Sequence, residues 1–391
     1  MKLIKRALES TILDISKQFP VVMLTGARQV GKTTLLKMLD PSRRFITLDD
    51  PIVRKLAVSD PALFLQTYQP PVIIDEFQYA PQLLEHIKLT VDARPEEMGL
   101  YWLTGSQQFQ LMKNVGESLA GRVGILSLGG IVQSEELSLK SLDKADDAMA
   151  IFQRIQRGSY PALVSGRVKD VQVFYGSYVK TYIERDVREI TKIADELQFL
   201  QFLKVIAART ANLLNLSEVA RDVGISQPTA RAWLSILESC GLVYLLRPYS
   251  ANITSRIVKT PKVYFMDTGL CSYLTGWTSA QTLASGAMSG AMLETFVVSE
   301  IIRKFWNSGR EAPVWFYRDK AGTEIDLLVE QDGVLNPIEI KKSASPSLKD
   351  VKAFAKVASE GVKLGNGTLV CLVESPVPLS RNVQVLPVGR L

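Results

Sequence analysis

Residues 21–39 read VVMLTGARQVGKTTLLKML. Apolar residues, then a glycine-containing turn, then helix-forming residues predict a buried strand, a loop and a helix in that order. Gly26 and Gly31 permit backbone angles that other residues resist, so successive amides of the loop can point inward at phosphate oxygens. The stretch predicts a phosphate-binding loop (P-loop) at the edge of a parallel sheet, and hence an α/β fold.

The same loop predicts how ATP would be held. Lys32 is placed to reach the terminal phosphates, and the Thr33 hydroxyl is placed to hold Mg²⁺. The helix that starts near Gly31 offers its positive end to the nucleotide. The residues expected to bind ATP are Gly26, Ala27, Arg28, Gln29, Val30, Gly31, Lys32, Thr33, Thr34 and, after a later strand, Ser106.

Two acidic residues follow the next strongly apolar run, PVIIDEFQ at residues 71–78. Asp75 would stand at the strand end, where a carboxylate can bind the metal ion through water. Glu76 is the candidate base that polarises the attacking water. A further strand, LYWLTGS, is followed by polar groups that would contact the γ-phosphate or the water, namely Thr104, Ser106 and Gln107; an ordinary polar strand end is the alternative.

Arg122, in the sequence LAGRVG, is a candidate arginine finger. Such a cation stabilises the charge of the transition state when it reaches the nucleotide of a neighbouring subunit. This interpretation implies a homo-oligomer. The alternative is a surface arginine without a catalytic role.

Length and composition bound the class of protein. With 391 residues the chain exceeds what one hydrophobic core usually organises, so several domains are expected. A net charge of +6 permits an acidic partner without requiring one. Three cysteines at long spacings are typical of core positions in a reducing compartment. No apolar run approaches the roughly 18 to 20 residues that span a bilayer, so we expect a cytoplasmic protein with no membrane partner.

Changes of pattern along the chain predict four domains. Short apolar runs that alternate with helical stretches indicate an ATPase core over residues 1–135, and helical periodicity follows over 136–210. Two short helices and strands predict a winged helix-turn-helix over 211–286. A long helix followed by strands indicates an α/β domain over 287–391.

The helix-turn-helix lies in LSEVARDVGISQPTARAWLSILESCGLVYLL, residues 216–246. Ser217 is expected to cap the first helix, Gly224 to end it, and Ser226 to cap the second. In a DNA reader the exposed residues of the second helix would meet bases and phosphates. Arg231 is its one basic residue, so DNA binding and a purely structural module both remain open. The residues expected on the buried face are Ala230, Trp233, Leu234 and Leu237, and those on the exposed face are Gln227, Thr229, Arg231 and Ser235.

The C-terminal part contains a second candidate site, in TEIDLLVE (323–330) and PIEIKK (337–342). If these strands pair, Asp326 and Glu339 can chelate a divalent ion while Lys341 orients or activates a water. Glu294, in the preceding helix, would support them. An oxygen-lined site of this kind suits Mg²⁺ or Mn²⁺ and would cleave phosphodiesters in a restriction-endonuclease-like fold. An exposed, charge-rich hairpin is the alternative.

Taken together, GARQVGKTTLL, VIIDEFQ, LTGS, LAGR, YIERDV, FMDTGL, YRDKAGTEIDLLVE and IEIKKS resemble the bacterial and archaeal AAA-type ATP-binding proteins that have a C-terminal domain of unknown function. The resemblance implies an ATPase core, a winged helix and a C-terminal domain with a nuclease-like core. It extends over nearly the whole chain.

Two classes of function follow. In the first, Mg²⁺-dependent ATP hydrolysis is coupled to a nucleic-acid-associated role, and the C-terminal domain binds or cuts DNA. In the second, the protein is a nucleotide-dependent interaction module whose C-terminal domain is an inactive nuclease fold. The presence of Asp326, Glu339 and Lys341 favours the first, and the weakly basic recognition helix favours the second.

Overall fold

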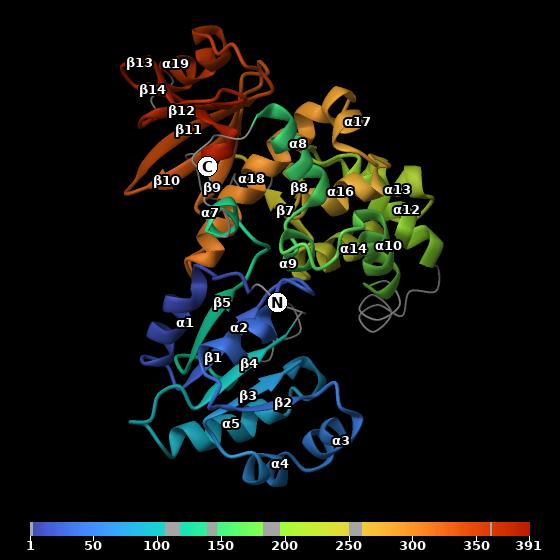
Figure 1. Cartoon of the computed structure of the whole chain (residues 1–391), viewed down its shortest axis with the longest axis vertical. Coiled ribbons are helices and arrows are strands. Elements are labelled where there is room, and N and C mark those ends of the chain that lie inside the picture. The colour runs from blue at the N-terminus through green and yellow to red at the C-terminus, as the bar shows by residue number, and fades with distance from the viewer. Residues whose placement is uncertain (1–2, 106–117, 139–146, 183–195, 250–259, 360–361) are drawn as a thin grey trace.

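A computed structural model gives the structure of the protein. It describes residues 3–105, 118–138, 147–182, 196–249, 260–359 and 362–391. Figure 1 shows the N-terminal part at the bottom, the C-terminal part at the top, and the helices of the middle part beside them. None of the helices in these ranges combines the length and the apolar character that crossing a membrane requires.

The N-terminal part is built on a five-stranded parallel sheet in the order β2-β3-β4-β1-β5. The parallel sheet predicted from the sequence is confirmed, and β4 separates the P-loop strand β1 from β3. Parallel strands buried on both faces read as continuous apolar runs, which is why the sequence located them. The strands are β1 (Val21–Thr25), β2 (Arg44–Thr47), β3 (Val72–Asp75), β4 (Tyr101–Thr104) and β5 (Val123–Ser127), and the helices are α1 (Leu8–Ser16), α2 (Lys32–Leu39), α3 (Pro51–Ser59), α4 (Pro61–Thr67) and α5 (Leu83–Asp92), with the 3-10 turn η1 (Phe77–Tyr79).

Helices make up most of the next part of the chain. They are α7 (Gln133–Leu137), α8 (Ala148–Arg157), α9 (Pro161–Val164), α10 (Val171–Tyr182) and α12 (Glu196–Ala207). The aromatic rings of Tyr160, Phe174, Tyr175 and Tyr178 pack against one another between α9 and α10. Such ring pairs add to the stability that burial already provides.

Two helices then follow at the predicted helix-turn-helix, α13 (Leu216–Val223) and α14 (Gln227–Ser239). Gly224 ends α13 in the left-handed conformation, and Ser226 caps α14 by accepting from the Thr229 amide. The predicted cap at Ser217 is wrong: Asn215 accepts from the amides of residues 217 and 218, because α13 begins two residues earlier than that cap implies. Strands β6 (Asn212–Leu213), β7 (Val243–Leu246) and β8 (Lys262–Phe265) form an antiparallel sheet in the order β6-β8-β7.

The C-terminal part has a six-stranded mixed sheet in the order β13-β14-β12-β11-β10-β9. Its strands β10 and β11 lie at the two runs, TEIDLLVE and PIEIKK, that the sequence indicated. The helices are α16 (Thr268–Leu274), α17 (Ala280–Ser285), α18 (Ser289–Asn307) and α19 (Lys352–Ser359), with 3-10 turns η3 (Leu348–Val351) and η4 (Val388–Arg390), and the strands are β9 (Val314–Arg318), β10 (Glu324–Gln331), β11 (Val334–Lys341), β12 (Gly367–Cys371), β13 (Val377–Ser380) and β14 (Val383–Pro387).

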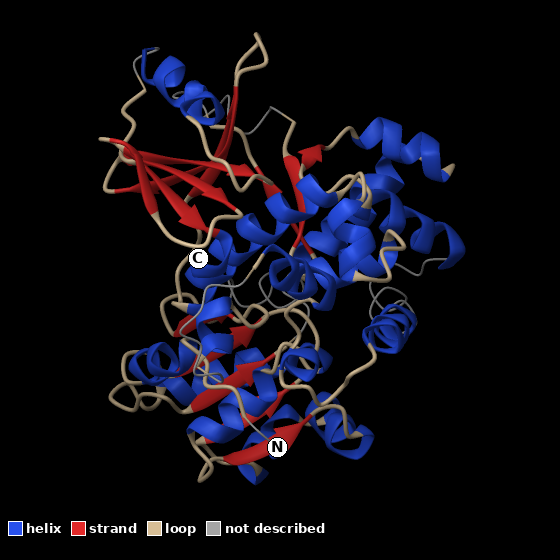
Figure 2. Ribbon diagram, turned by 45° about the horizontal axis from the view of Figure 1, so that its top comes forward, coloured by secondary structure: helices blue, strands red, loops and turns tan. Residues whose placement is uncertain are grey.

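A hydrophobic core links the parts, and the N-terminal and C-terminal sheets each have a further buried cluster of their own. A single cluster of buried apolar residues extends from Leu8 in α1 through the middle helices to Ile302 in α18 and Val388 near the C-terminus. Figure 2 shows the two larger sheets at opposite ends, with helices between them. The three cysteines are buried and free, as the sequence predicted. Because α18 packs into this shared core, the C-terminal domain is fixed against the nucleotide-binding part.

Candidate functional site

The P-loop adopts the backbone that its glycines allow. Gly26 and Gly31 have φ values of 140° and 100°, in the region that favours glycine. A Cβ atom on Gly26 would lie 2.2 Å from the carbonyl oxygen of Leu128, so no larger residue fits there. The ammonium group of Lys32 donates to the carbonyls of Gly26 and Ala27, at 2.8 and 2.9 Å, which holds it over the loop.

Asp75 is the centre of a cluster of hydroxyl groups at the carboxyl ends of the strands. The hydroxyl of Thr33 donates to Asp75 Oδ1 at 2.7 Å, and that of Thr104 donates to the same oxygen. Thr47, which the sequence analysis did not select, donates to Asp75 Oδ2 at 3.4 Å. Thr33 and Asp75 together supply hard oxygen donors of the kind that Mg²⁺ prefers, so the residues present fit this ion.

Glu76 directly follows Asp75 and has a left-handed backbone, with φ 55°. A non-glycine residue in this conformation is strained, and such strain concentrates at functional sites. The side-chain amide of Gln78 donates to Glu76 Oε2, which orients the carboxylate. Glu76 contributes to the wall of the same pocket as Lys32 and Thr33.

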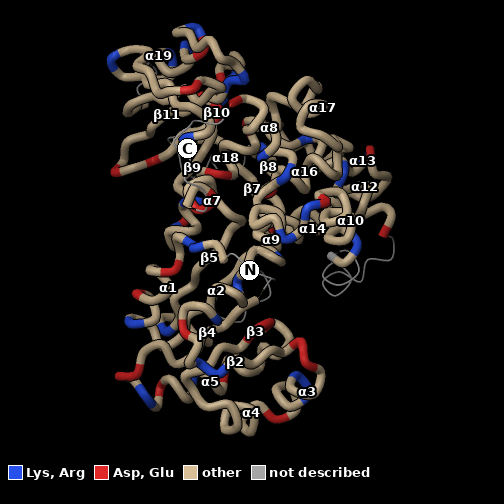
Figure 3. The backbone as a smooth tube through the Cα atoms, in the orientation of Figure 1, with Lys and Arg blue, Asp and Glu red and all other residues tan. Residues whose placement is uncertain are grey.

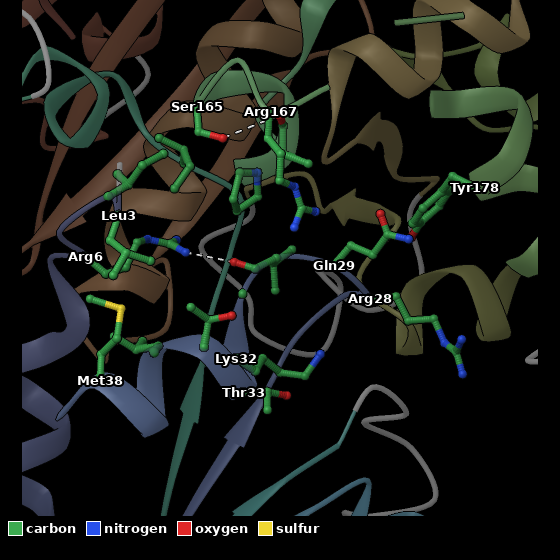
Figure 4. Close-up of a pocket in the computed structure, with 18 of the residues that line it drawn as sticks. Leu3, Arg6, Arg28, Gln29, Lys32, Thr33, Met38, Ser165, Arg167 and Tyr178 are labelled. Carbon is green, nitrogen blue, oxygen red and sulfur yellow. Dashed lines mark hydrogen bonds between the residues drawn. The ribbon is translucent and has the colours of Figure 1, made fainter. Parts of the chain in front are cut away.

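This pocket has a volume of about 360 Å³ and lies between the P-loop and the helical part. Figure 4 shows Lys32 and Thr33 on the P-loop, with Ser165, Arg167 and Tyr178 from the helical part. The sequence did not predict these last three residues, because only the tertiary fold brings the loop after α9 and helix α10 next to the P-loop. Of the predicted nucleotide-binding residues, Arg28, Gln29, Val30, Gly31, Lys32, Thr33 and Thr34 line the pocket.

Arg6 is a second residue that the sequence analysis missed. Its guanidinium group donates to the P-loop carbonyl of Val30 at 2.9 Å and to Glu135 at 3.2 Å. Burial lowers the pKa of Arg6, although the Glu135 carboxylate opposes this shift. Asn307, at the end of α18, donates to both oxygens of Glu135 at 3.4 Å. A buried polar network therefore joins the P-loop to the C-terminal domain.

One predicted site residue is not described by the structure, and another stands apart from this pocket. Ser106 lies outside the described residues. Arg122 precedes β5, where its carbonyl accepts from the Val21 amide, so it lies at the opposite end of the strands from the P-loop. Its guanidinium group forms an ion pair with Asp92 at 2.5 Å. Arg122 therefore does not reach its own nucleotide pocket, and its role in a neighbouring subunit stays a prediction.

The structure brings together the predicted C-terminal residues. Strands β10 and β11 pair with Leu327 opposite Ile338, which places Asp326 beside Glu339. Asp326 Oδ2 accepts from the Ile340 amide at 2.9 Å, and Lys341 donates to Glu339 Oε1 at 2.5 Å.

The pKa values of the carboxyl groups at this site are raised above their usual range. Burial, with Asp326 nearby, raises the pKa of Glu339 to about 8, and burial also raises the pKa of Asp326. The second oxygen of Glu339, Oε2, is buried without a hydrogen-bond partner. An unpaired buried acceptor is costly, so this oxygen leaves a hydrogen-bonding capacity unmet.

Glu294 is present at this site but faces a different partner. Its Oε1 atom accepts from Lys262 at 2.9 Å and from the Tyr264 hydroxyl at 2.6 Å. Burial, then Asp326, raises the pKa of Glu294 to about 7. Burial disfavours the charged form of Lys262, but Glu294, Asp326 and Glu324 outweigh this and raise its pKa. In the described part of the chain no three His, Cys, Asp or Glu residues form a group that could hold a metal.

The helix α14 offers little positive charge. Arg231 and Ser235 are exposed, whereas Ala230, Trp233, Leu234 and Leu237 are buried as predicted. Glu238, also exposed on this helix, offsets the charge of Arg231. Figure 3 shows Lys and Arg interspersed with Asp and Glu along the chain. Phosphate neutralisation by α14 alone would therefore be weak.

Solved structures share part of this fold. The Walker-type ATPase PABY2304 of Pyrococcus abyssi is 17% identical, with a TM-score of 0.46 over 70% of this chain and 96% of its own. A RuvB structure from Thermotoga maritima is 19% identical, with a TM-score of 0.32 over 61% of this chain and 87% of its own. These values describe a partial likeness of fold, and no function follows from them.

Sequence comparison divides the chain into three matched regions. A family described as an AAA domain matches residues 18–137, and two domains of unknown function, DUF8612 and DUF4143, match residues 149–281 and 289–391. The uncharacterized proteins Mb2031c of Mycobacterium bovis and Rv2008c of Mycobacterium tuberculosis are each 30% identical over 374 residues, or 95% of this chain and 81% of either relative. The chain therefore belongs to the same family as these mycobacterial proteins, and it is an AAA-type P-loop protein.

Proposed function

We propose that the protein binds ATP with Mg²⁺ in the pocket above the P-loop and hydrolyses it. The observation that carries this proposal is the Thr33–Asp75 hydrogen bond of 2.7 Å, next to the buried amine of Lys32 in a pocket of about 360 Å³. Lys32 would exchange its two carbonyl partners for phosphate oxygens, which are charged and therefore stronger acceptors. The loop amides and the start of α2 would bind the remaining phosphate oxygens.

In this proposal each residue has one task. Thr33 and Asp75 would hold Mg²⁺, which neutralises charge on the phosphates. Glu76 would accept a proton from the attacking water, because its carboxylate borders the pocket and is oriented by Gln78. Arg167 would approach the nucleotide from the helical part, since it is exposed and lines the same pocket. These assignments describe a water-mediated phosphoryl transfer.

Nucleotide binding would be coupled to the C-terminal domain through α18. One end of this helix holds Asn307, which contacts the Glu135 and Arg6 network beneath the P-loop. Nearer its other end, the helix presents Glu294 to the C-terminal carboxylates. A shift of the P-loop would therefore move a rigid element shared by both sites.

For the C-terminal domain we propose a nucleic-acid-associated role that uses a divalent ion. The observation in favour is the Asp326 and Glu339 pair with the buried, unpartnered Oε2 of Glu339. Carboxylate oxygens on paired strands fit Mg²⁺ or Mn²⁺, and Lys341 would orient a water beside them. The alternative is an interaction module without nuclease chemistry, and the weak charge of α14 favours it.

The test that separates these functions is ATP turnover with and without DNA. Phosphate release that requires Mg²⁺ and rises with single- or double-stranded DNA is expected if the nucleic-acid role is correct. Turnover that DNA leaves unchanged would favour the interaction module. A purified chain that binds no ATP in calorimetry would contradict the proposed function as a whole.

A second prediction concerns cleavage by the C-terminal domain. We expect weak nicking of supercoiled DNA in Mn²⁺ or Mg²⁺, because two carboxylates and a lysine can place both the ion and the water. Lys341→Ala should remove this nicking and leave ATP hydrolysis unchanged. Lys349→Ala removes an exposed lysine of the 3-10 turn η3, is the matched control and should nick like the wild type. Nicking that survives both Lys341→Ala and Asp326→Asn would come from a contaminant, and the domain would then be a binding fold.

A further inference from the structure

Lys262 enters the C-terminal carboxylate cluster from a different part of the chain. It begins β8, in the three-stranded sheet that follows the helix-turn-helix, and its side chain is 4% exposed. Its ammonium nitrogen lies 2.9 Å from Glu294 Oε1, 2.5 Å from Glu324 Oε1 and 3.9 Å from Asp326 Oδ1. The carboxylates are on α18 and β10, so the amine joins two parts of the protein at the proposed metal site.

The position of Lys262 accounts for the incomplete set of metal ligands. Glu294 would be the third carboxylate beside Asp326 and Glu339, yet its Oε1 atom is engaged by Lys262 and Tyr264. A carboxylate that accepts two hydrogen bonds at one oxygen must give up at least part of that bonding to coordinate an ion there. Glu294 Oε1 is therefore occupied as long as Lys262 and Tyr264 donate to it.

The cluster nevertheless leaves one buried carboxyl oxygen without a partner. The carboxylates of Glu294, Glu324, Asp326 and Glu339 face three cations, Lys262, Lys341 and Arg318. Even so, the buried Oε2 atom of Glu339 has no hydrogen-bond partner. An unsatisfied buried acceptor favours the entry of a cation or a hydrogen-bond donor.

We propose that the ammonium group of Lys262 competes with a divalent cation for these carboxylates and thereby sets the metal affinity of the C-terminal domain. A fixed positive charge 3.9 Å from Asp326 repels an incoming ion, and it occupies the oxygen of Glu294 that the ion would use. Lys262 is thus a positioning residue rather than a catalytic one. This inference rests on the proposed C-terminal metal site.

The experiment measures Mn²⁺ binding to the full chain by calorimetry without nucleotide. Lys262→Met should bind Mn²⁺ about tenfold more tightly than the wild type, because one close positive charge is removed. Lys262→Arg keeps the charge and should leave the affinity close to that of the wild type. Asp326→Asn supplies the background for any ion bound elsewhere in the chain.

Two further variants control for folding and for local charge. Lys262→Gln is a polar, neutral replacement that tests the same effect if Lys262→Met does not fold. Lys342→Met also removes a positive charge, but Lys342 donates to the carbonyl of Ala284 and to the hydroxyl of Ser289 instead of to the carboxylates. This variant should therefore bind Mn²⁺ like the wild type.

The outcomes separate this inference from the proposal on which it rests. A variant that is merely damaged would bind the ion more weakly, so tighter binding by the neutral variants supports competition by Lys262. If the wild type and the neutral variants bind Mn²⁺ equally, and Asp326→Asn binds it more weakly, the role of Lys262 alone is overturned. If no variant binds Mn²⁺ above the Asp326→Asn background, the C-terminal metal site and this inference both fail.

Discussion

Glu76→Gln is expected to retain ATP affinity and to lose turnover by at least about 100-fold. Glutamine preserves the size and the polar contacts of the side chain, but it cannot accept a proton from the attacking water. General bases typically contribute about 100-fold or more to the rate, and this contribution appears only in the transition state. Calorimetry with ATP and single-turnover phosphate release measure the two effects separately.

The matched control for this exchange is Glu85→Gln. Glu85 is an exposed glutamate in α5 and is not among the residues that line the ATP pocket. We expect its variant to bind and hydrolyse ATP like the wild type. If Glu76→Gln also turned over at the wild-type rate, the assignment of the base would be wrong, whereas the assignment of the pocket would stand.

Lys32→Ala should impair ATP binding rather than hydrolysis alone, and it should remove most of the ATP affinity. The amine is buried beside the loop carbonyls, so its charge-assisted bonds to phosphate would form with little competition from water. Truncating one partner of a buried, hydrogen-bonded charge pair costs about 2 to 5 kcal/mol, which is roughly a 30-fold or larger loss of affinity. Calorimetry with ATP and Mg²⁺ measures this loss directly.

Lys37→Ala is the corresponding control. Lys37 lies in the same helix, α2, but its amine stacks over the ring of Phe45 and is not part of the pocket wall. Loss of this exposed contact should leave ATP affinity unchanged. Equal affinities for Lys32→Ala and Lys37→Ala would remove the phosphate-binding role of Lys32 and, with it, the central step of the proposed function.

The amino-acid sequence alone determined the elements whose signals are local. Strands β1 and β3 are buried on both faces, so each reads as an uninterrupted apolar run that ends at a polar residue. Gly26 and Gly31 adopt backbone φ angles that glycine allows and other residues resist. These two glycines therefore located the P-loop in the sequence. The two-residue period of strands put the Asp326 and Glu339 side chains on one face if the two strands pair, and the observed register sets them side by side.

The helix caps show how far such local signals reach. Gly224 and Ser226 end and begin their helices as predicted, since glycine and serine have strong positional preferences. Asn215 rather than Ser217 caps α13, because both are good capping residues and only the three-dimensional path of the chain selects between them. Element boundaries are therefore less determined by sequence than the elements themselves.

Only the tertiary structure determined which distant residues share a site. Arg6 contacts the P-loop at Val30, 24 positions away. Arg167 borders the proposed ATP pocket from the helical part. Lys262 reaches Glu324 and Asp326, which are 62 and 64 positions away in the sequence. The sequence around a long side chain does not indicate which remote residue that side chain will contact. Their contacts are fixed by how α18 and the sheets pack in the shared core, and that packing depends on the whole chain at once.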